Sequence, residues 1–511
     1  MGFKQEKKAQ GRIKGKTPVA VLDIGSNSIR MVIYEHHSRA LTPLYNEKSA
    51  CALGQGVAAS GLLNFENMQK AFKSMRRFAL VIKLMKVEEV YCVATSAVRE
   101  AKNGGEFANQ IEQITGVRVQ ILSGEDEAYF AALGAYAGIV NCNEQNLIVG
   151  DLGGGSLELA SLENDDVSAC KSFELGVIRL AEKSGYCLKT ATNLARETIK
   201  PYLSNFAKAD AFCAIGGSWR ALAKLHQMQN EYPLHMIQNY EVDAKNMIEF
   251  CLDIIKQYIA SNSFFGWESV NNNRRELLPF GAIVLVQILI DGNFESVVFS
   301  TLGVREGYLY SLLDKKEQQI DPLIQLCQEL AILRSRSPTH ANELIDFTQN
   351  FFDRYYKKET KHQIRLRKSA CLLADIAWRG HPDYRGSQAV DLVAYGALVG
   401  INHADRVFIS YVLMTRYMGL KHNDIDGELL LLCGQEMIEK AKLLGALLRV
   451  AFPLSASMSG VLPQINFLIK EEELQLILPP ELAFLDGSRL KSRLSQLAKI
   501  ANFTSHLVVV E

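Results

Sequence analysis

The sequence predicts an α/β fold of two similar lobes with a cleft between them, followed by a mainly helical domain and a small α/β appendage. A short apolar strand, a polar turn and a second strand occur at residues 19–36 and again at 147–161. Strand and helix signals alternate between and after these hairpins, which is typical of a mixed or parallel sheet covered by helices. After residue 313, long helical patterns replace most of the strand signals.

These changes of pattern divide the chain into five segments. We expect a leader at 1–17, lobes at 18–140 and 141–313, a helical domain at 314–450 and an α/β appendage at 451–511. The leader is basic and lacks the apolar core of a signal peptide. We therefore expect it to be a disordered tail.

Composition limits the classes of partner. The 511 residues contain 56 basic and 56 acidic side chains, so the formal net charge is zero and nothing global favours nucleic acid or a membrane surface. No stretch approaches the roughly 18 continuous apolar residues of a membrane span. The ten cysteines are scattered without a C-x-x-C pair, which favours reduced, mostly buried thiols. We expect a cytoplasmic protein.

The two hairpin turns carry the clearest functional signal. Asp23 precedes "IGSNS" and Asp151 precedes "LGGGS", 151 − 23 = 128 residues apart. A third glycine turn follows the strand signal "AFCAI". A plain hairpin turn explains one such loop, but a matched pair favours a phosphate-containing anion, because glycine exposes backbone N–H donors. The predicted binding residues are Ser26, Asn27, Ser28, Gly153, Gly154, Gly155, Ser156, Gly216, Gly217 and Ser218.

The aspartates of these turns repel phosphate, so we expect them to act on a cation or on water. Asp23 and Asp151 would hold a hydrated Mg²⁺ or orient a water molecule. Glu158 leaves the second loop on the strand face that also carries Ser156. A metal or water ligand and a solvated strand glutamate are equally compatible with that position.

A strand end between the loops adds three candidates. Thr95 and Ser96 stand where a strand signal gives way to a helical one, and Arg99 follows in the first turn. A guanidinium there can bind phosphate oxygens in a bidentate manner and neutralise transition-state charge. The alternative is that Ser96 caps the helix and Arg99 forms a surface ion pair with a carboxylate.

Glu127 is the candidate general base. Ser123 and Asp126 form a capping box, and this motif accounts for Glu125 and Asp126 without catalysis. Glu127 instead borders the apolar run that begins at Ala128, so one side of its helix is buried. Its place after a strand is where α/β sheets hold ligands. From there a carboxylate can deprotonate water.

Six motifs then occur in order: "LDIGSNSIRMVI", "ATSAVREAKN", "SGEDEA", "VGDLGGGSLEL", "IGGSWRAL" and "GVREGYLY". Together they resemble the exopolyphosphatase / guanosine pentaphosphate phosphatase family, within the superfamily of acetate and sugar kinases, heat-shock proteins and actin. The resemblance covers residues 18 to about 313. It implies two actin-like (ribonuclease H-like) lobes that hold the end of a polyphosphate chain in the interlobe cleft.

The resemblance also implies roles for individual residues. The glutamate of the family's S-G-x-x-E-A motif deprotonates the water that attacks the terminal phosphorus, with Mg²⁺ neutralising the chain, and orthophosphate is released. A homodimer acting on inorganic polyphosphate is expected. The matching residues are Glu127 for that base, Asp151 and Glu158 for the second loop, Asn27 and Ser28 for the first loop, and Arg99 for the arginine.

Three alternatives remain. A guanosine pentaphosphate phosphatase cleaves the same kind of phosphoanhydride, and guanosine tetraphosphate is a conceivable regulator. A sugar or acetate kinase would need a base pocket near "AIGGSWRAL", where Trp219 and Arg220 are unconvincing. A nucleotide sensor or an actin-like structural element would bind without catalysis.

The helical domain resembles HD-type phosphohydrolases, whose metal site contains a His-Asp doublet. Here Ala374 precedes Asp375, so we expect no second metal-dependent active site, although His381 and His403 lie nearby in sequence. We expect this domain to bind polyphosphate or to mediate dimerisation, with a solvated surface as the alternative. The residues of the expected positive channel are Arg365, Arg367, Lys368, Arg379 and Arg385.

Overall fold

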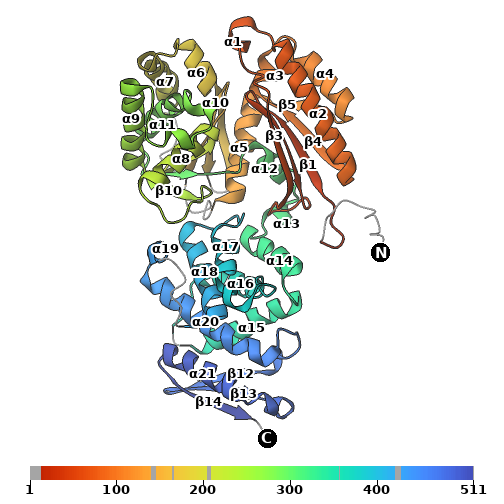
Figure 1. Cartoon of the computed structure of the whole chain (residues 1–511), viewed down its shortest axis with the longest axis vertical. Coiled ribbons are helices and arrows are strands. Elements are labelled where there is room, and N and C mark those ends of the chain that lie inside the picture. The colour runs from red at the N-terminus through yellow and green to blue at the C-terminus, as the bar shows by residue number, and fades with distance from the viewer. Residues whose placement is uncertain are drawn as a thin grey trace. The chain divides into compact units, whose positions relative to one another are not determined.

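The computed structural model describes residues 13–139, 146–163, 166–203, 209–355, 357–420 and 427–509. The chain forms two compact units, Met1–Gln319 and Ile320–Glu511 (Figure 1). Most of the predicted basic leader lies outside the described residues. The finer boundaries at 140, 313 and 450 stay predictions of the sequence.

Two sheets built on one plan form the core of the first unit. The first sheet has the strand order β3-β2-β1-β4-β5 and contains β1 (Val19–Ile24), β2 (Ser28–Tyr34), β3 (Pro43–Ala50), β4 (Glu89–Ala94) and β5 (Val119–Ile121). The second has the order β10-β11-β9-β6-β7-β8 and contains β6 (Leu147–Leu152), β7 (Leu157–Glu163), β8 (Asp166–Phe173), β9 (Ala211–Gly216), β10 (Tyr240–Asp243) and β11 (Ser296–Phe299). In each sheet an antiparallel hairpin is followed by a strand parallel to its first member. The predicted repeat of one α/β plan is confirmed.

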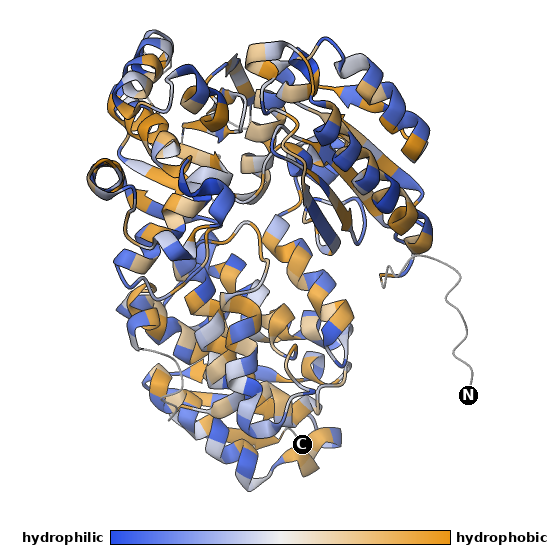
Figure 2. Cartoon of the chain, turned by 45° about the horizontal axis from the view of Figure 1, so that its top comes forward, coloured by the Kyte–Doolittle hydropathy of each residue, from blue (hydrophilic) through white to orange (hydrophobic). Residues whose placement is uncertain are grey.

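Helices cover these sheets. Those associated with the first half of the unit are α1 (Val57–Ser60), α2 (Phe65–Met85), α3 (Ser96–Glu100), α4 (Gly104–Thr115) and α5 (Gly124–Gly138). The second half contains α6 (Val177–Lys183), α7 (Leu188–Leu203), α8 (Gly217–Gln229), α9 (Ala244–Ser261), α10 (Asn272–Arg275), α11 (Leu278–Gly292), α12 (Val304–Ser311) and α13 (Lys315–Gln318). The outer helices are amphipathic, and Figure 2 shows hydrophilic and hydrophobic residues alternating along them. In α2, for example, Phe72, Met75 and Phe78 face the core.

Helix α11 is apolar on nearly every side, and other helices surround it. It packs against α7, α8 and α9, and its residues from Leu278 to Leu289 are buried. Burial of such a helix follows from its composition, since a polar environment on any side would expose apolar surface. In the part of the chain that the structure describes, no helix combines the length and hydrophobicity needed to cross a bilayer.

The nine described cysteines are free thiols, and seven of them are buried. Cys170 is half-buried and Cys187 is exposed. The expectation of reduced, mostly buried thiols agrees with these positions.

Helices α5 and α12 each follow the last strand of one sheet and pack on the other sheet. The alanine face of α5 packs on β6, β7 and β9 of the second sheet, whereas Leu309 of α12 packs on Val19 and Val21 of the first sheet. Where the two helices cross, a Cβ at Gly307 would overlap the carbonyl oxygen of Phe130. Glycine therefore allows the backbones to approach closely.

The second unit is mainly helical and ends in a small sheet. Its helices are α14 (Pro322–Arg334), α15 (Pro338–Arg354), α16 (Lys361–Leu373), α17 (Arg385–Ala394), α18 (His403–Met418), α19 (Gly427–Leu431), α20 (Gln435–Ser455) and α21 (Ser488–Ala501). The sheet β12-β13-β14 contains β12 (Asn466–Lys470), β13 (Glu473–Leu478) and β14 (Thr504–Val509). A hairpin, a helix and a parallel strand follow one another, as the sequence predicts.

Candidate active site

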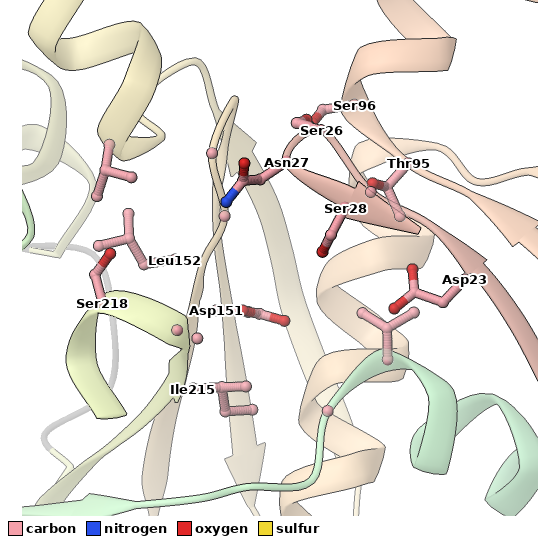
Figure 3. Close-up of a pocket in the computed structure, with 18 of the residues that line it drawn as sticks. Asp23, Ser26, Asn27, Ser28, Thr95, Ser96, Asp151, Leu152, Ile215 and Ser218 are labelled. Atoms are coloured by element: carbon pink, nitrogen blue, oxygen red, sulfur yellow. The ribbon is translucent and has the colours of Figure 1, made fainter. Parts of the chain in front are cut away.

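A cavity of about 210 Å³ lies between the two lobes of the first unit. The turns that follow β1 and β6 and the helices that follow β4 and β9 line it. Figure 3 shows Asp23 and Asp151, from opposite lobes, pointing into the same space. The cavity brings together 14 of the 17 predicted site residues, namely Asp23, Ser26, Asn27, Ser28, Thr95, Ser96, Glu127, Asp151, Gly153, Gly154, Glu158, Gly216, Gly217 and Ser218.

The same hydrogen bond closes both D-x-G turns. In the first loop, Gly25 N–H donates to the Ser28 carbonyl at 3.1 Å; in the second, Gly153 N–H donates to the Ser156 carbonyl at 3.0 Å. Each turn therefore projects two residues beyond the end of its hairpin. The two D-x-G sequences therefore form turns of the same geometry on opposite sides of the cavity.

The carbonyl groups of these loops are bonded to segments behind them. Carbonyls at 26–27 accept hydrogen bonds from the backbone of 51–54 at 2.7–3.2 Å, and those at 153–154 accept from 177–179 at 2.9–3.3 Å. Among the described residues, this arrangement uses the loop carbonyls and leaves loop N–H groups to meet a ligand. Backbone donors gathered in this way suit an anion.

Two glycines of the set are required by close packing. Gly216 has φ of 117°, and a Cβ there would lie 2.5 Å from the Leu152 carbonyl oxygen. A Cβ at Gly155 would lie 2.9 Å from Ser96 Oγ and 3.2 Å from Ser26 Oγ. Gly155 thus faces the first lobe beside the cavity, and Ser156 is buried at the start of β7, so neither lines the cavity.

Glu127 lies in the first turn of α5, and only 8% of it is exposed. Its Oε2 accepts a hydrogen bond from Arg99 Nη1 at 2.9 Å. Burial raises the pKa of Glu127 to about 7, although Arg99 acts to lower it; the charges of Asp151 and Asp23 raise it further. A carboxylate with a pKa near neutrality can take a proton from water and release it again.

Arg99 is placed differently from the expectation. Its Nη1 also donates to the Leu122 carbonyl at 2.9 Å, and the described residues that line the cavity include Glu127 but not Arg99. The guanidinium therefore orients the candidate base in this structure. Direct contact between Arg99 and phosphate oxygens stays a prediction.

Glu158 is 2% exposed, so the alternative of a solvated strand residue is wrong. Helix α5 covers this face of the second sheet, and Ser172 Oγ donates to Glu158 Oε1 at 2.8 Å. Burial and the charges of Glu127 and Asp151 raise the pKa of Glu158 well above its ordinary value. Burial also raises the pKa of Asp151 to about 6, while Arg220 acts to lower it.

Asp23 forms an ion pair with an arginine side chain, that of Arg305. Arg305, in the first turn of α12, donates from Nη1 to Asp23 Oδ2 at 2.7 Å. Burial acts to lower the pKa of Arg305, but Glu306 and Asp23 outweigh it and raise that pKa. Glu306 is held in turn by Tyr34, whose hydroxyl donates to it at 2.6 Å. Asp23 thus ties the first loop to α12.

Five basic residues that the sequence analysis did not assign line the cavity: Arg30, Lys48, Arg220, Arg274 and Arg305. The sequence contains a signal for one of them, Arg220. Arg99 is the fourth residue of α3, after β4, and Arg220 is the fourth residue of α8, after the equivalent strand β9. The internal repeat therefore points to Arg220. No comparable local pattern indicates Lys48 or Arg274.

These cations repel one another. Burial and the charges of Arg274, Arg220 and Arg30 lower the pKa of Lys48 to about 8. Burial and the charge of Arg305 lower the pKa of Arg220 to about 10, although Asp151 opposes this. A polyanion between them would relieve the repulsion. The electrostatics therefore favour a ligand with several negative charges.

The residues present fit a magnesium ion only in part. Among the described residues, no three His, Cys, Asp or Glu side chains form a ready metal cluster, and Asp23 is already bonded to Arg305. The carboxylates of Asp151 and Glu158, whose pKa values rise together, would accept a cation nearby. Mg²⁺ is commonly held by one or two carboxylates plus substrate phosphates. The donors fit that arrangement and not a cage built by protein alone.

In the second unit, two arginines bind the carboxylate of Asp375, the residue compared above with the aspartate of a His-Asp doublet. Arg336 donates to Asp375 at 2.7 Å and 2.8 Å, and Arg416 donates to it at 3.3 Å. The absence of a second metal-dependent site there stays a prediction. Asp375 serves as the partner of two guanidinium groups.

The expected positive channel is wrong for one of its five residues, Arg367. Arg365 is paired with Asp321 and the Gly400 carbonyl, and Arg367 is 1% exposed and paired with Glu359. Arg367 lies on the inward side of α16, where a charge needs a partner. The Arg365 side chain is 20% exposed, so its place in a channel stays a prediction.

Comparisons with known proteins agree with this fold. The family model "Ppx/GppA phosphatase family" matches residues 32–316, more than half of the chain, and "Exopolyphosphatase, C-terminal" matches residues 323–508. A guanosine-5'-triphosphate,3'-diphosphate pyrophosphatase from Pseudoalteromonas translucida (strain TAC 125) is 27% identical over 332 residues, which is 61% of this chain and 64% of that protein. The chain thus matches somewhat less than two thirds of that relative's length.

Two crystal structures show the same fold at low identity. An exopolyphosphatase from Cytophaga hutchinsonii ATCC 33406 is 20% identical, with a TM-score of 0.52, and covers 58% of this chain and 97% of its own. An exopolyphosphatase-like protein is 24% identical, with the same TM-score and the same coverage. The extent of the family match, together with the paired D-x-G turns and Glu127, shows that the chain belongs to the Ppx/GppA phosphatase family.

Proposed function

We propose that the protein is an exopolyphosphatase that hydrolyses the terminal phosphoanhydride of inorganic polyphosphate. The observation that carries this proposal is the composition of the cavity. Five cations and two loops of backbone donors surround a buried glutamate, and none of the described lining residues is aromatic. A phosphate chain needs charge and N–H donors, which this lining supplies, whereas a purine base is commonly stacked on an aromatic side chain.

The chemistry follows from the placement of each group. The terminal phosphate lies between the two loops, and Lys48, Arg220 and Arg274 attract the chain behind it. Glu127, oriented by Arg99, takes a proton from the attacking water. The loop N–H groups stabilise the equatorial oxygens of the transition state. Mg²⁺, when bound with the substrate, would neutralise phosphate charge beside Asp151 and Glu158.

A guanosine pentaphosphate phosphatase is the second candidate. It is favoured by the relative from Pseudoalteromonas translucida, whose name specifies that nucleotide. The C-terminal match to an exopolyphosphatase model favours the first candidate. Both substrates end in a phosphoanhydride, so the loops and Glu127 serve either equally.

Orthophosphate release from the two substrates decides between them. We expect kcat/KM for long-chain polyphosphate with Mg²⁺ to exceed that for guanosine pentaphosphate by about tenfold or more, since more phosphates contact the cations. A preference for the nucleotide would contradict the proposal and support the second candidate. Release from neither substrate would contradict both and leave a binding protein.

A further inference from the structure

An ion pair joins the two lobes beside the cavity. Arg179, in α6 of the second lobe, donates to the carboxylate of Glu100, the last residue of α3 in the first lobe. The Arg179 side chain is only 7% exposed, and that of Glu100 is 26% exposed. A buried guanidinium needs a partner, so this contact differs from an exposed ion pair of little value.

Arg179 also holds the second glycine loop. Its backbone N–H donates to the Gly154 carbonyl at 3.3 Å, and the preceding N–H, of Ile178, donates to the same oxygen at 2.9 Å. A Cβ at Gly176 would overlap the backbone of Gly154 and Gly155, so α6 begins directly against the loop. One residue therefore contacts the loop through its backbone and the opposite lobe through its side chain.

Helix α3 connects this ion pair to the candidate base. It is five residues long. Ser96, at its start, lies 2.8 Å from Ser26 of the first loop, oxygen to oxygen. Arg99, next to Glu100, donates to Glu127. A Cβ at Gly104 would overlap the Val98 carbonyl, so α3 is packed tightly against the start of α4.

We propose that the Arg179–Glu100 ion pair is a positioning contact that locks the second glycine loop to helix α3. When the loop encloses the terminal phosphate, the lock fixes Arg99 and hence the carboxylate of Glu127 for attack. Arg179 and Glu100 do not touch the substrate. This inference rests on the proposed role of Glu127 and adds a reason why the base is aligned with the second glycine loop.

The chain offers a matched control beside the lock. Glu174 lies 3.4 Å from Arg179 and 2.8 Å from Lys183, and its side chain is 69% exposed. It shares the partner of Glu100 but belongs to the same lobe as Arg179. Replacing Glu174 with glutamine removes one neighbouring charge without touching the contact between the lobes.

The test compares steady-state hydrolysis of polyphosphate by Glu100→Gln, Arg179→Met and Glu174→Gln with that of the unchanged chain. We expect the first two variants to lose about tenfold or more in kcat with little change in KM, because the base is misplaced while the anion site remains. The charge swap Glu100→Arg with Arg179→Glu should restore most of the loss. Glu174→Gln should keep its activity.

The pH profile supplies a readout that a purely structural contact would not change. Glu127 faces Arg99, Asp151, Asp23 and Glu158. Withdrawal of Arg99 removes the opposing positive charge, so the acid limb of kcat/KM should move upward by about one pH unit in Glu100→Gln. Single variants with kcat within about twofold and an unmoved acid limb, or a Glu174→Gln variant with an equal loss, would overturn the inference.

Hydrogen–deuterium exchange separates this inference from the proposed function. With polyphosphate absent, the amides of α3 and of residues 153–156 should exchange faster in both single variants than in Glu174→Gln. Unchanged exchange would overturn the lock whatever the substrate is. Faster exchange in a protein that hydrolyses no polyphosphate would support the lock and refute the function.

Discussion

Glu127 titrates near neutrality because burial opposes its charge more strongly than Arg99 stabilises it. The pKa is about 7, and the carboxylate must be ionised to accept a proton from water. We therefore expect kcat/KM for polyphosphate to rise about tenfold per pH unit below pH 7 and to level off above it. A pH profile measured at constant ionic strength checks this. An acid limb near pH 4.5 would contradict the assignment of Glu127.

Lys48 should produce the alkaline limb of the pH profile of kcat/KM. Its pKa of about 8 means that it loses its positive charge as the pH rises through 8, which weakens attraction for the phosphate chain. We expect kcat/KM to fall above pH 8, and Lys48→Arg to extend the plateau toward alkaline pH, because an arginine stays charged. An alkaline limb that is the same in both proteins would show that another group causes it.

Single residues also mark where sequence reasoning reached its limit. The two loops can be predicted from a local signal, glycine after strands. A capping box and an apolar run single out Glu127, and the family resemblance adds its role as base. Lys48 and Arg274 were not found, because their meeting in the cavity depends on how distant segments pack. The two readings left open for Glu158 were decided by α5, which covers its face of the sheet.

At the level of elements, the second glycine loop offers a test of the anion site. A Cβ at Gly154 would lie 3.0 Å from Ile178 Cδ1 and 3.4 Å from Ser26 Cβ, contacts that a flexible side chain can accommodate. We expect Gly154→Val to fold and to lose polyphosphate hydrolysis by about 100-fold or more, because the side chain enters the anion's space. Orthophosphate release and circular dichroism measure the two properties.

Gly105→Val is the matched control, since no heavy atom lies within 4 Å of a Cβ there. It should fold and retain hydrolysis. A Gly154→Val protein with normal folding and normal activity would refute the assignment of this loop to phosphate binding.

The crossing of α5 and α12 sets a second expectation. Because a Cβ at Gly307 would overlap the Phe130 carbonyl, Gly307→Ala should lower the free energy of unfolding by roughly 1–3 kcal/mol. Thermal unfolding followed by calorimetry measures the change, and Gly105→Ala serves as the control with open space. Equal stability of the two variants would mean that the helices can separate without cost.

Hairpins, capped helices and the two-lobed plan could be predicted because each follows from local periodicity and turn residues. The sheets on which α5 and α12 pack could not, since an alanine-rich face fits either sheet by composition. Its destination is fixed by tertiary packing, where Gly134 and Gly307 admit the close crossing. Chain order alone therefore does not show which sheet each helix covers.

At the level of the whole molecule, the second unit contains internal charge pairs. Asp375 is 4% exposed and bonded to Arg336 and Arg416. Asp375→Ala would leave Arg416, with a side chain 10% exposed, without its carboxylate. We expect a loss of roughly 3 kcal/mol in unfolding free energy and no change in the Mg²⁺ concentration needed for hydrolysis.

The control for that variant is Asp383→Ala, because the Asp383 side chain is 79% exposed. Chemical denaturation and a Mg²⁺ titration of orthophosphate release measure the two effects. A Mg²⁺ requirement that changes only in Asp375→Ala would contradict the view that this unit contains no metal-dependent site.

The central claim is that Glu127 deprotonates the attacking water, and Glu127→Gln tests it most directly. Orthophosphate release from polyphosphate should fall by about 10²–10⁴-fold, while the dissociation constant for polyphosphate changes little, since the amide keeps the shape of the side chain. Glu125→Gln, an exposed change in the same helical turn, is the matched control and should retain activity. Undiminished release by Glu127→Gln would contradict the account.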